Sequence, residues 1–525
     1  MERANGKNHA KQKMNRQEQI AFLKSQAEWD VVVIGGGATG LGTALDALSR
    51  GLKVALIEKF DFAKGTSSRS TKLVHGGVRY LKNGDIALVR EALHERGLLL
   101  QNAPHLCRDM HFIIPSYSVW HKWFYGIGLK VYDALSGKLS LGKSKILSKQ
   151  AVIESLPGVK TDGLKGGVLY HDGQFDDARL AISMAKTIAA KGGCVVNYCE
   201  WLSFQKNENG KITGLTVRDT FKDDTFDLKA KIVINAAGVF AEHIMEADEG
   251  KSHLKIRPSQ GVHIVLDASF SPGQNALMVP STTDGRVLFA VPWHNALIVG
   301  TTDTEVKTIE TEPKSTEEEV QFILENARLF LAKKPERSDI KSVFAGLRPL
   351  ISAEGKSSKA LSRKHVVHEG KSGLINILGG KWTTYRSMAK DAIDQALASN
   401  PISTQKSQTE HLHFVGYQEK SDWKDPLHVY GSEREKLEKH GSTVSLSEVF
   451  FICEAQIRFA VLEEMALTLE DVLCRRIRCM LLNAAETIKI APKVVAIMAE
   501  NLGETEAWKT QQLNNFYELS KKYSL

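Results

Sequence analysis

The sequence predicts an α/β protein with a parallel-sheet nucleotide-binding domain, a β-rich second domain and an all-helical C-terminal domain. Three observations lead to this fold class. A βαβ pattern with a glycine-rich turn occupies residues 29–59, alternating polar and apolar residues fill 255–350, and helical spacing runs through 423–525. A chain of 525 residues is also too long for one small core, which agrees with several domains.

The opening βαβ unit begins with Val31–Ile34, a short apolar run that is typical of a buried parallel strand. Helical spacing follows in Leu41–Leu48, and "KVALIE" at 53–58 reads as the next strand. The turn "GGGATG" lies between the first strand and the helix, and the second strand ends on an acidic residue. The unit therefore predicts a site for a nucleotide cofactor.

Three glycines of the turn, Gly35, Gly37 and Gly40, match the pattern G-x-G-x-x-G. Glycine permits the tight turn and lets the backbone approach a pyrophosphate, while the helix N-terminus supplies free N–H groups and a partial positive charge. Glu58 stands at the right distance to bind a ribose hydroxyl, and an acidic residue there favours a 2′-hydroxyl over a 2′-phosphate. The motif does not by itself distinguish NAD from FAD.

Two later turns offer further places where the backbone can approach a dinucleotide. The strand in "INAAG" runs into Gly238, and "INILGGKWTTYR" at 375–386 gives a strand, Gly379 and Gly380, and then a helix start beside Lys381. A helix N-terminus and a lysine together stabilise negative charge on a bound group. In isolation, such a turn is also compatible with a purely structural role.

The stretch "STKLVHGGVRYL" at 70–81 has an unusual composition. Its alternation is typical of a strand, yet the adjacent Gly76 and Gly77 weaken a strand and mark close approach of the backbone to another group. Arg79 and Tyr80 follow directly. From the residues alone, the stretch is equally compatible with a cofactor contact and with a bulged edge strand that carries a surface arginine and tyrosine.

The remaining segments complete the domain plan. We expect a helix over 86–110 that ends near Pro104, followed by an aromatic-rich segment at 111–132. The plan divides the chain into a basic N-terminal extension at 1–28, a nucleotide-binding domain with an interleaved β-rich substrate domain at 29–400, a polar linker at 401–422 and a helical domain at 423–525.

Composition limits the class of protein. Apolar residues make up 42% and charged residues 25%, as in ordinary soluble globular proteins. The six cysteines form no C-x-x-C pair, which argues against a disulfide framework or a zinc ribbon, and no metal site is expected, at His411 and His413 included. No apolar run is long enough for a transmembrane helix. The net charge of +8 is compatible with anionic substrates, membrane surfaces or nucleic acid, and selects none of them.

Taken together, the motifs resemble those of the flavin-dependent glycerol-3-phosphate dehydrogenases, within the D-amino-acid-oxidase-like group of flavoproteins. The matching segments include "VVIGGGATGLGTALDALSRGLKVALIEK", "TSSRSTKLVHGGVRYL", "REALHERGLLLQNAPHL", "DARLAISMAKTIAAKG", "INAAG", "GLRPL" and "GGKWTTYR". The tail with "TLEDVLCRRIR" at 468–478 is similar to the C-terminal domain of that family. Trp382 departs from the pattern, since a smaller apolar residue is more usual there.

The resemblance implies an FAD-binding Rossmann-like domain of the glutathione-reductase type, with the β-rich substrate domain inserted into it. FAD is the implied cofactor, and no metal is implied. The residues implied to contact FAD are Gly35, Gly37, Gly40, Glu58, Thr66, Ser67, Ser68, Lys72, His75, Gly76, Gly77, Gly238, Gly379, Gly380, Lys381 and Thr383.

For catalysis, the resemblance implies His263, Arg348 and Lys381. A lone histidine on the apolar strand "SQGVHIVL" is more often a core residue, and only the resemblance gives His263 the task of taking the substrate hydroxyl proton. A glycerol phosphate dianion needs cationic donors in fixed positions. The substrate ligands that the resemblance implies are Arg79, Tyr80, Arg348, Arg363 and Lys381.

The implied activity is oxidation of sn-glycerol 3-phosphate to dihydroxyacetone phosphate, with hydride passing to N5 of FAD and electrons then passing to a membrane quinone. The expected partners are this substrate pair, the quinone and an anionic lipid surface, with no nucleic acid, and a homodimer is a candidate assembly. We expect peripheral attachment to the cytoplasmic face of a membrane, through the aromatic segment 118–135, the N-terminal extension or the helical tail. Two alternatives stay open: an oxidase of the same fold that reduces oxygen, and a non-catalytic flavin-binding protein.

Overall fold

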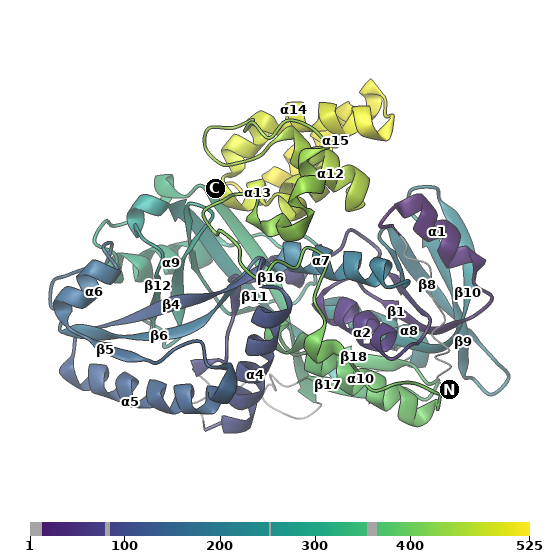
Figure 1. Ribbon diagram of the computed structural model, residues 1–525, viewed down its shortest axis with the longest axis horizontal. Coiled ribbons are helices and arrows are strands. Elements are labelled where there is room, and N and C mark those ends of the chain that lie inside the picture. The colour runs from purple at the N-terminus through teal and green to yellow at the C-terminus, as the bar shows by residue number, and fades with distance from the viewer. Residues whose placement is uncertain (1–12, 79–83, 251–253, 354–364) are drawn as a thin grey trace, which may run out of the picture.

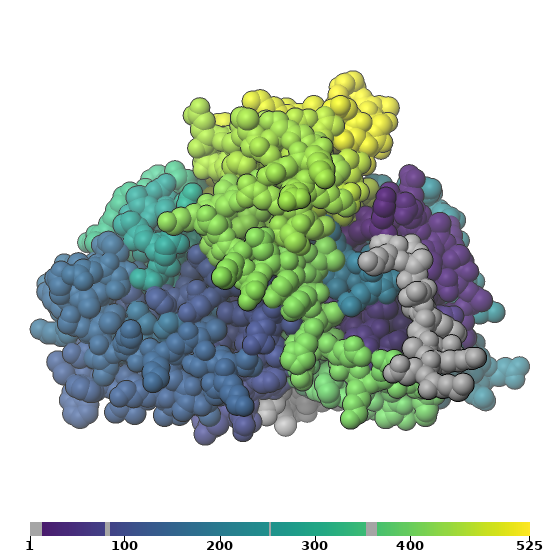
Figure 2. Space-filling view, in the orientation of Figure 1, coloured from purple at the N-terminus to yellow at the C-terminus, as the bar shows by residue number. Residues whose placement is uncertain are grey.

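The computed structural model describes residues 13–78, 84–250, 254–353 and 365–525, and all structural statements concern these ranges. Two β-sheets stand side by side, and a group of helices from the C-terminal part of the chain lies over the line where they meet (Figure 1). Figure 2 shows these yellow-green helices seated against both halves of the molecule. The predicted α/β fold class is confirmed.

The first sheet is mostly parallel and is assembled from separate stretches of the chain. Its strands are β1 (Trp29–Ile34), β2 (Val54–Ile57), β7 (Cys194–Val196), β10 (Asp224–Asn235), β17 (Val366–Glu369) and β18 (Ile375–Leu378), in the order β17-β18-β10-β1-β2-β7. Two further strands, β8 (Cys199–Lys206) and β9 (Ile212–Asp219), extend β10 as an antiparallel ribbon. Within the sheet, Val33 lies opposite Ile234 and Leu56, so β1 is the central strand of the βαβ unit.

Helices cover both faces of the first sheet, which is why its strands read as continuous apolar runs. On one face, Val31 and Val33 join a core with α2 (Ala38–Ser49), α7 (Asp177–Ala190) and α10 (Tyr385–Ser399). On the other face, Val32 and Ile34 join a core with α1 (Arg16–Ser25). The N-terminal extension therefore contributes a helix that is packed on the sheet. A short helix, α8 (Ala241–Glu249), follows β10.

The second sheet is largely antiparallel and carries the β-rich part of the chain. Its main path is β15-β11-β14-β13-β12-β4-β6-β3, with β16 paired to β11 and β5 paired to β6. The strands are β3 (Leu73–Val74), β4 (Cys107–Ser116), β5 (Lys145–Leu147), β6 (Gly166–Phe175), β11 (Leu254–Asp267), β12 (Ala276–Val279), β13 (Leu288–Trp293), β14 (Ala296–Gly300), β15 (Thr304–Glu305) and β16 (Ser342–Ala353). The helices of this half are α4 (Ile86–Asn102), α5 (Val119–Ser136), α6 (Lys149–Ser155) and α9 (Glu317–Phe330).

The C-terminal part is helical. It comprises α11 (Arg434–Glu438), α12 (Glu454–Glu463), a π-helical turn η10 (Asp471–Arg476), α13 (Cys479–Leu482), α14 (Ala484–Leu502) and α15 (Glu506–Ser520). Its core includes Val265 and Phe344 of the second sheet, so the two share one apolar cluster. The positions at which we divided the chain into domains stay predictions.

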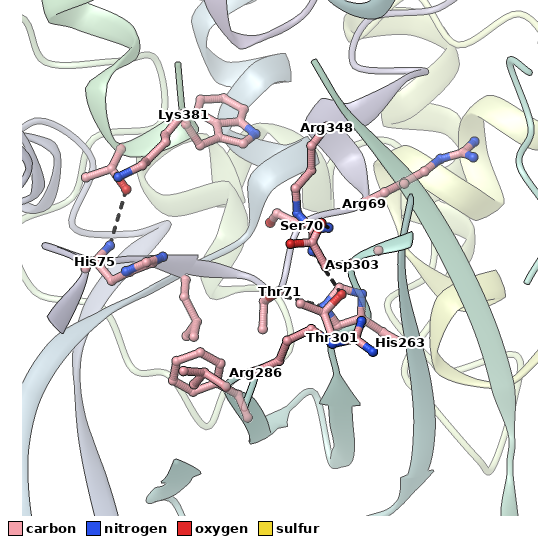
Figure 3. Close-up of a pocket in the computed structure, with 18 of the residues that line it drawn as sticks. Arg69, Ser70, Thr71, His75, His263, Arg286, Thr301, Asp303, Arg348 and Lys381 are labelled. Carbon is pink, nitrogen blue, oxygen red and sulfur yellow. Dashed lines mark hydrogen bonds and ion pairs between the residues drawn. The ribbon is translucent and has the colours of Figure 1, made fainter. Parts of the chain in front are cut away.

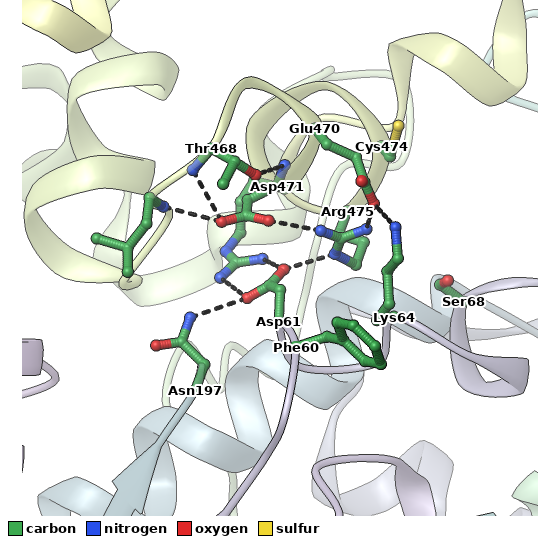
Figure 4. A network of polar contacts seen from close by, with 12 residues as sticks. Phe60, Asp61, Lys64, Ser68, Asn197, Thr468, Glu470, Asp471, Cys474 and Arg475 are labelled. Atoms are coloured by element: carbon green, nitrogen blue, oxygen red, sulfur yellow. Dashed lines mark hydrogen bonds and ion pairs between the residues drawn. The ribbon is translucent and has the colours of Figure 1, made fainter. Parts of the chain in front are cut away.

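Buried ion pairs join the helical part to the first sheet (Figure 4). Asp61, which follows β2, accepts hydrogen bonds from Arg475 at 2.5 Å and from Arg476 at 2.7 Å. Burial opposes the charge on Asp61, but the two guanidinium groups outweigh it and hold the pKa of this carboxyl well below its usual range. A second junction is the two-pronged pair between Arg179 and Glu464, at 2.7 Å for each contact. Charged side chains survive here because each has its partner.

Two local expectations need correction. The helix expected over 86–110 ends at Asn102, and residues from Cys107 onward belong to β4. Pro104 ends the helix because proline disfavours the helical conformation in the residue before it. In the glycine-containing stretch 70–81, only Leu73–Val74 is a strand, and positions 79–81 lie outside the described residues. Among the described residues, no helix combines the length and apolar character needed to cross a membrane.

Candidate active site

A cavity of about 320 Å³ opens where the first sheet meets the second. The loop that follows β18 contributes Gly380, Lys381 and Thr383, and strands of the second sheet contribute His263 and Arg348. Figure 3 shows Lys381 and His75 on one side of this cavity and Arg348 and His263 on the other. The structure therefore brings together catalytic candidates that lie far apart in the sequence.

The glycine-rich turn is shaped by close backbone contacts. A side chain at Gly35 would lie only 2.6 Å from the carbonyl oxygen of Ala236, and the φ of Gly35 is +114°, which glycine alone adopts readily. The turn leads into α2, where Ala38 N–H donates to Ser67 Oγ at 2.9 Å. The remaining N–H groups of this first turn are the kind that bind a pyrophosphate.

Glu58 stabilises the glycine-rich turn. Its carboxylate accepts hydrogen bonds from the N–H groups of Gly36 at 2.6 Å and Phe60 at 2.8 Å. Burial raises the pKa of Glu58, and these two hydrogen bonds oppose that rise. The side chain sits at the end of β2, the place predicted for a ribose ligand, and its role as a ribose ligand stays a prediction.

The segment 66–77 includes β3, a strand of the second sheet. Thr66 donates to the carbonyl of Leu347 at 2.6 Å, and the N–H of His75 donates to Thr383 Oγ1 at 3.3 Å. Thr66, His75 and Gly77 line the cavity, and Gly77 has a φ of +75°. The segment thus ties the substrate half to the loop after β18.

Gly76 is explained by packing. A side chain there would lie 2.5 Å from Leu93 and from the hydroxyl of Tyr132, to which the Gly76 N–H donates at 2.8 Å. Its bare backbone is thus required by the core beneath it. This observation offers a packing reason for one glycine of the pair that we expected beside the cofactor.

Lys72 and Ser68 do not line this cavity, and their expected contacts with FAD stay predictions. The Lys72 ammonium donates to Asp177 and to the Ser68 carbonyl, both at 2.7 Å, in a fully buried position. Burial lowers the pKa of Lys72 to about 7, although Asp177 opposes that change. In this structure the charge of Lys72 is thus held in a buried ion pair with Asp177.

His263 lies on β11 with its ring buried in the wall of the cavity. Its Nε2 is 2.9 Å from Thr71 Oγ1, and its ring stacks on Phe344 with centroids 4.8 Å apart. Among the described residues, Nδ1 has no hydrogen-bond partner. Burial lowers the pKa of His263 well below its usual value, and the positive charges of Lys72 and Arg348 lower it further. The imidazole is thus neutral near pH 7, as a proton acceptor must be.

Arg348 lies on β16, directly across from Ser259 of β11. Its guanidinium donates to Thr301 Oγ1 and to the carbonyl of Thr302, both at 3.1 Å. A side chain at Gly261 would overlap this guanidinium, so a glycine on β11 makes room for it. The arginine is therefore held in a fixed position at the cavity wall, as recognition of an anion requires.

Sequence reasoning missed several residues of the cavity. Arg286, Thr71, Thr301 and Asp303 all line it. Arg286 follows a glycine in a loop, and nothing in its neighbourhood distinguished it from a surface arginine. The run "GTTD" after the apolar strand β14 was a usable signal, because polar residues at the end of a buried strand often face a site. The predicted ligands Arg79, Tyr80 and Arg363 lie outside the described residues.

Gly238, Gly379 and Gly380 occupy turns with positive φ, at +61°, +72° and +80°. Gly238 follows β10 and Gly379 follows β18, the two strands that lie on one side of β1. The carboxyl ends of these parallel strands meet at one edge of the first sheet, together with the turn after β1. Nucleotide cofactors bind at this edge in sheets of this kind.

Comparison with known proteins agrees with this geometry. Two family models match, "FAD dependent oxidoreductase" over residues 30–386 and "C-terminal domain of alpha-glycerophosphate oxidase" over residues 374–511. The mitochondrial glycerol-3-phosphate dehydrogenase of Bos taurus is 38% identical over 97% of this chain and 76% of its own length. The chain belongs to the FAD-dependent glycerol-3-phosphate dehydrogenase family.

One solved structure is similar over nearly the whole chain, and a second shares the fold. The glycerol-3-phosphate dehydrogenase from Bacillus halodurans, complexed with FAD, has a TM-score of 0.77 at 29% identity, with 97% of each chain covered. An FAD-bound L-alpha-glycerophosphate oxidase from Mycoplasma pneumoniae has a TM-score of 0.57 at 17% identity and covers 73% of this chain, which shows a shared fold. The enzyme is thus an FAD-dependent oxidoreductase, and the alternative of a non-catalytic flavin-binding protein falls away.

FAD is the cofactor of the enzyme, and the residues present fit it. Gly35 and Gly37 add no side chains of their own at the start of α2, whose first-turn N–H groups are the kind that bind a pyrophosphate. Gly380 and Lys381 line the cavity, and there a helix start and a lysine stabilise negative charge on a bound group. The individual FAD contacts predicted from the sequence stay predictions.

Proposed function

We propose that the enzyme oxidises sn-glycerol 3-phosphate to dihydroxyacetone phosphate. One observation carries the proposal: a buried, neutral imidazole, His263, shares a cavity with the fixed guanidinium of Arg348 and with Lys381. A phosphorylated secondary alcohol needs this combination, because the phosphate requires cations and the hydroxyl requires a base. The names of the relatives point to the same substrate.

Substrate binding and proton transfer are assigned to different residues of the chain. Arg348 and Lys381 bind the anionic substrate, with Arg286 at the same cavity and with Arg79, Tyr80 and Arg363 as sequence-based candidates outside the described residues. FAD, when bound, supplies the acceptor for the hydride that leaves C2. His263 takes the hydroxyl proton on its ring nitrogen, while Thr71 and Phe344 hold the ring in place.

Visible spectroscopy under anaerobic conditions tests the substrate. Addition of sn-glycerol 3-phosphate to the purified holoenzyme is expected to bleach the flavin band, and unphosphorylated glycerol at the same concentration is expected to leave the band unchanged. A flavin band that persists with sn-glycerol 3-phosphate would contradict the proposed substrate. Equal bleaching by both compounds would contradict the assigned role of the cations.

The proposed electron acceptor is a membrane quinone, and molecular oxygen is the second candidate. The relatives named as dehydrogenases favour the quinone, whereas the C-terminal family model is named after an oxidase. Turnover with a short-chain quinone is to be compared with peroxide formation in air-saturated buffer. Fast quinone reduction with little peroxide supports the first candidate, and the reverse result supports the second.

A quinone acceptor requires contact with a bilayer, and α5 is the proposed docking element. Five large apolar side chains on this helix are more than half exposed: Val119 at 54%, Trp120 at 84%, Trp123 at 53%, Phe124 at 59% and Ile127 at 64%. Tyr132, on the same helix, is instead a core residue. A single exposed apolar stripe with aromatic residues is typical of a helix at the headgroup level. Attachment to the cytoplasmic face and a homodimeric state stay predictions.

Vesicle sedimentation at low and high salt tests the docking. The parent enzyme is expected to bind anionic vesicles, and a Trp120→Ser/Trp123→Ser variant is expected to bind less because it loses buried apolar area. Absence of binding by the parent at low salt would reject docking. Equal binding by both proteins would show that α5 is not the docking element and would leave the basic N-terminal extension and the helical tail as candidates.

A further inference from the structure

Three potential metal ligands meet on the second sheet, on the face that points away from the cavity. Asp109 and His111 lie two residues apart on β4, and His171 lies directly opposite His111 on β6. Side chains alternate along a strand, and the neighbouring Phe112 and Tyr170 line the cavity. The three ligands therefore share the opposite face of the same pair of strands.

The ligand atoms of these side chains are already close together. One ligand atom from each residue can be chosen so that all lie within 4.8 Å of one another. His171 Nδ1 lies 2.9 Å from Asp109 Oδ2, and the two imidazole rings have centroids 4.6 Å apart. Small side-chain rotations would bring all three atoms to about 2.0–2.2 Å from one central ion, the range for zinc ligands. We propose that Asp109, His111 and His171 bind a divalent transition metal ion, with Zn²⁺ as the best match.

The ligand chemistry selects the class of metal. Two imidazoles and one carboxylate suit Zn²⁺, Co²⁺, Ni²⁺ or Cu²⁺, whereas Ca²⁺ and Mg²⁺ require sites built from oxygen atoms. The three protein ligands leave a fourth position open for water or for an exogenous ligand. Asp109 and His111 are exposed, so an ion can reach the site from solvent.

Neighbouring groups hold His171 in a suitable orientation. Gly142 lies against the Cε1 and Nε2 side of its ring, where a side chain would overlap the imidazole, so Nδ1 is the nitrogen that faces Asp109. On the backbone, Arg96 donates to the carbonyl of His171 at 3.3 Å. A ligand whose ring and backbone are both fixed loses little conformational entropy when it binds an ion. A simple surface ion pair between His171 and Asp109 would need neither the second imidazole nor this support.

Co²⁺ titration of the holoenzyme, freed of any affinity tag, tests the proposal. Co²⁺ serves as a spectroscopic probe that occupies zinc sites. The parent is expected to bind one equivalent with visible absorption bands outside the flavin region, and Zn²⁺ is expected to displace it. His111→Ala and Asp109→Asn are each expected to weaken binding at least tenfold. Because His111 and Asp109 are exposed, these variants are expected to keep the flavin spectrum and the circular dichroism of the parent.

A His411→Ala/His413→Ala variant provides the matched control, since it removes two histidines at i and i+2 elsewhere in the chain. Its Co²⁺ affinity is expected to equal that of the parent. The proposal is overturned if the parent shows no saturable binding or if His111→Ala binds one equivalent with parental affinity. Loss of binding in the His411/His413 variant alone would also overturn it, because the site would then lie in that segment.

Discussion

Replacement of Asp177 tests how the helical domain is joined to the wall of the active site. The carboxylate of Asp177, in the first turn of α7, accepts hydrogen bonds from Lys72 at 2.7 Å and from Arg478 at 2.8 Å. Lys72 belongs to the segment that carries Thr71, the partner of His263, and Arg478 belongs to the helical domain. All three charged groups are buried. One carboxylate thus holds two cations from different parts of the chain.

The expected loss follows from these contacts. Breaking a buried ion pair by removing one partner costs about 3–5 kcal/mol, because the other charge stays in the interior. Burial already lowers the pKa of Lys72 to about 7, so without Asp177 this lysine can shed its proton and limit the loss. Arg478 cannot deprotonate, so it keeps its charge, and Asp176 at 3.6 Å is then its remaining carboxylate partner. We therefore expect Asp177→Ala to lower the free energy of unfolding by about 3 kcal/mol.

Backbone strain adds to the dependence on Asp177. Lys72 and Arg478 both have positive φ, at 65° and 72°, a conformation that costs a non-glycine residue about 1 kcal/mol or more. The hydrogen bonds to Asp177 offset that cost. Lys72→Met leaves the pair between Asp177 and Arg478 intact and is expected to cost less than Asp177→Ala.

Urea unfolding of the holoenzyme, followed by tryptophan fluorescence, measures the effect. Glu518→Ala is the matched control, since its pair with Lys521 is mostly exposed and is expected to contribute less than about 1 kcal/mol. A loss of under about 1 kcal/mol in Asp177→Ala would refute the reasoning. So would a larger loss in Lys72→Met than in Asp177→Ala.

Three further predictions concern the cavity. Arg348→Ala is expected to lower kcat/KM by about ten- to a hundredfold with flavin content unchanged, because it removes a charge-assisted bond worth about 1.5–3 kcal/mol; unchanged kinetics would contradict it. Gly261→Ala is expected to raise KM with little change in stability, since the new methyl group displaces side-chain ends, the guanidinium of Arg348 and the hydroxyl of Thr301, and no backbone; a parental KM would count against that contact. Because the pKa of His263 is low, kcat/KM is expected to stay constant down to pH 6.5 and to fall only at lower pH. In His263→Asn this fall of kcat/KM at low pH, the acid limb of the profile, is expected to disappear. Because the unfolded chain binds a proton at this histidine and the native state does not, the free energy of unfolding is expected to decrease as pH falls below 6.5.

The first sheet was predictable because its signals are local. The apolar run of β1, the turn at Gly35–Gly40 and the acidic end of β2 are adjacent in sequence, and each has one physical interpretation. The helix after Ile86 was harder to delimit, since its apolar spacing continues past Asn102 into β4. There the hydrogen bonds of the second sheet decide the structure, and no local pattern reveals them.

The site could be predicted only in part, because cavities are made by contacts between distant segments. His263 and Arg348 could be named from motifs. The need for glycine at 261, against the guanidinium of Arg348, and at 300, against the ring of His263, became visible only when the strands were placed side by side. Lys72 shows the opposite case. A lysine beside a cofactor motif suggests a phosphate ligand, and only the fold shows that its charge is buried against Asp177.

The charges around His263 couple substrate binding to the strength of the base. Burial is the main cause of its low pKa, and the positive charges of Lys72 and Arg348 lower the pKa further. A bound dianion compensates the charge of Arg348, so the pKa of His263 should rise in the substrate complex, which makes the imidazole a stronger base when a proton is there to be taken. The acid limb of kcat, which reports the complex, should then lie at higher pH than the acid limb of kcat/KM, which reports the free enzyme. Parallel pH profiles of the two constants measure this difference, and in Arg348→Ala it should shrink. Coincident limbs in the parent enzyme would show that Arg348 does not act on His263.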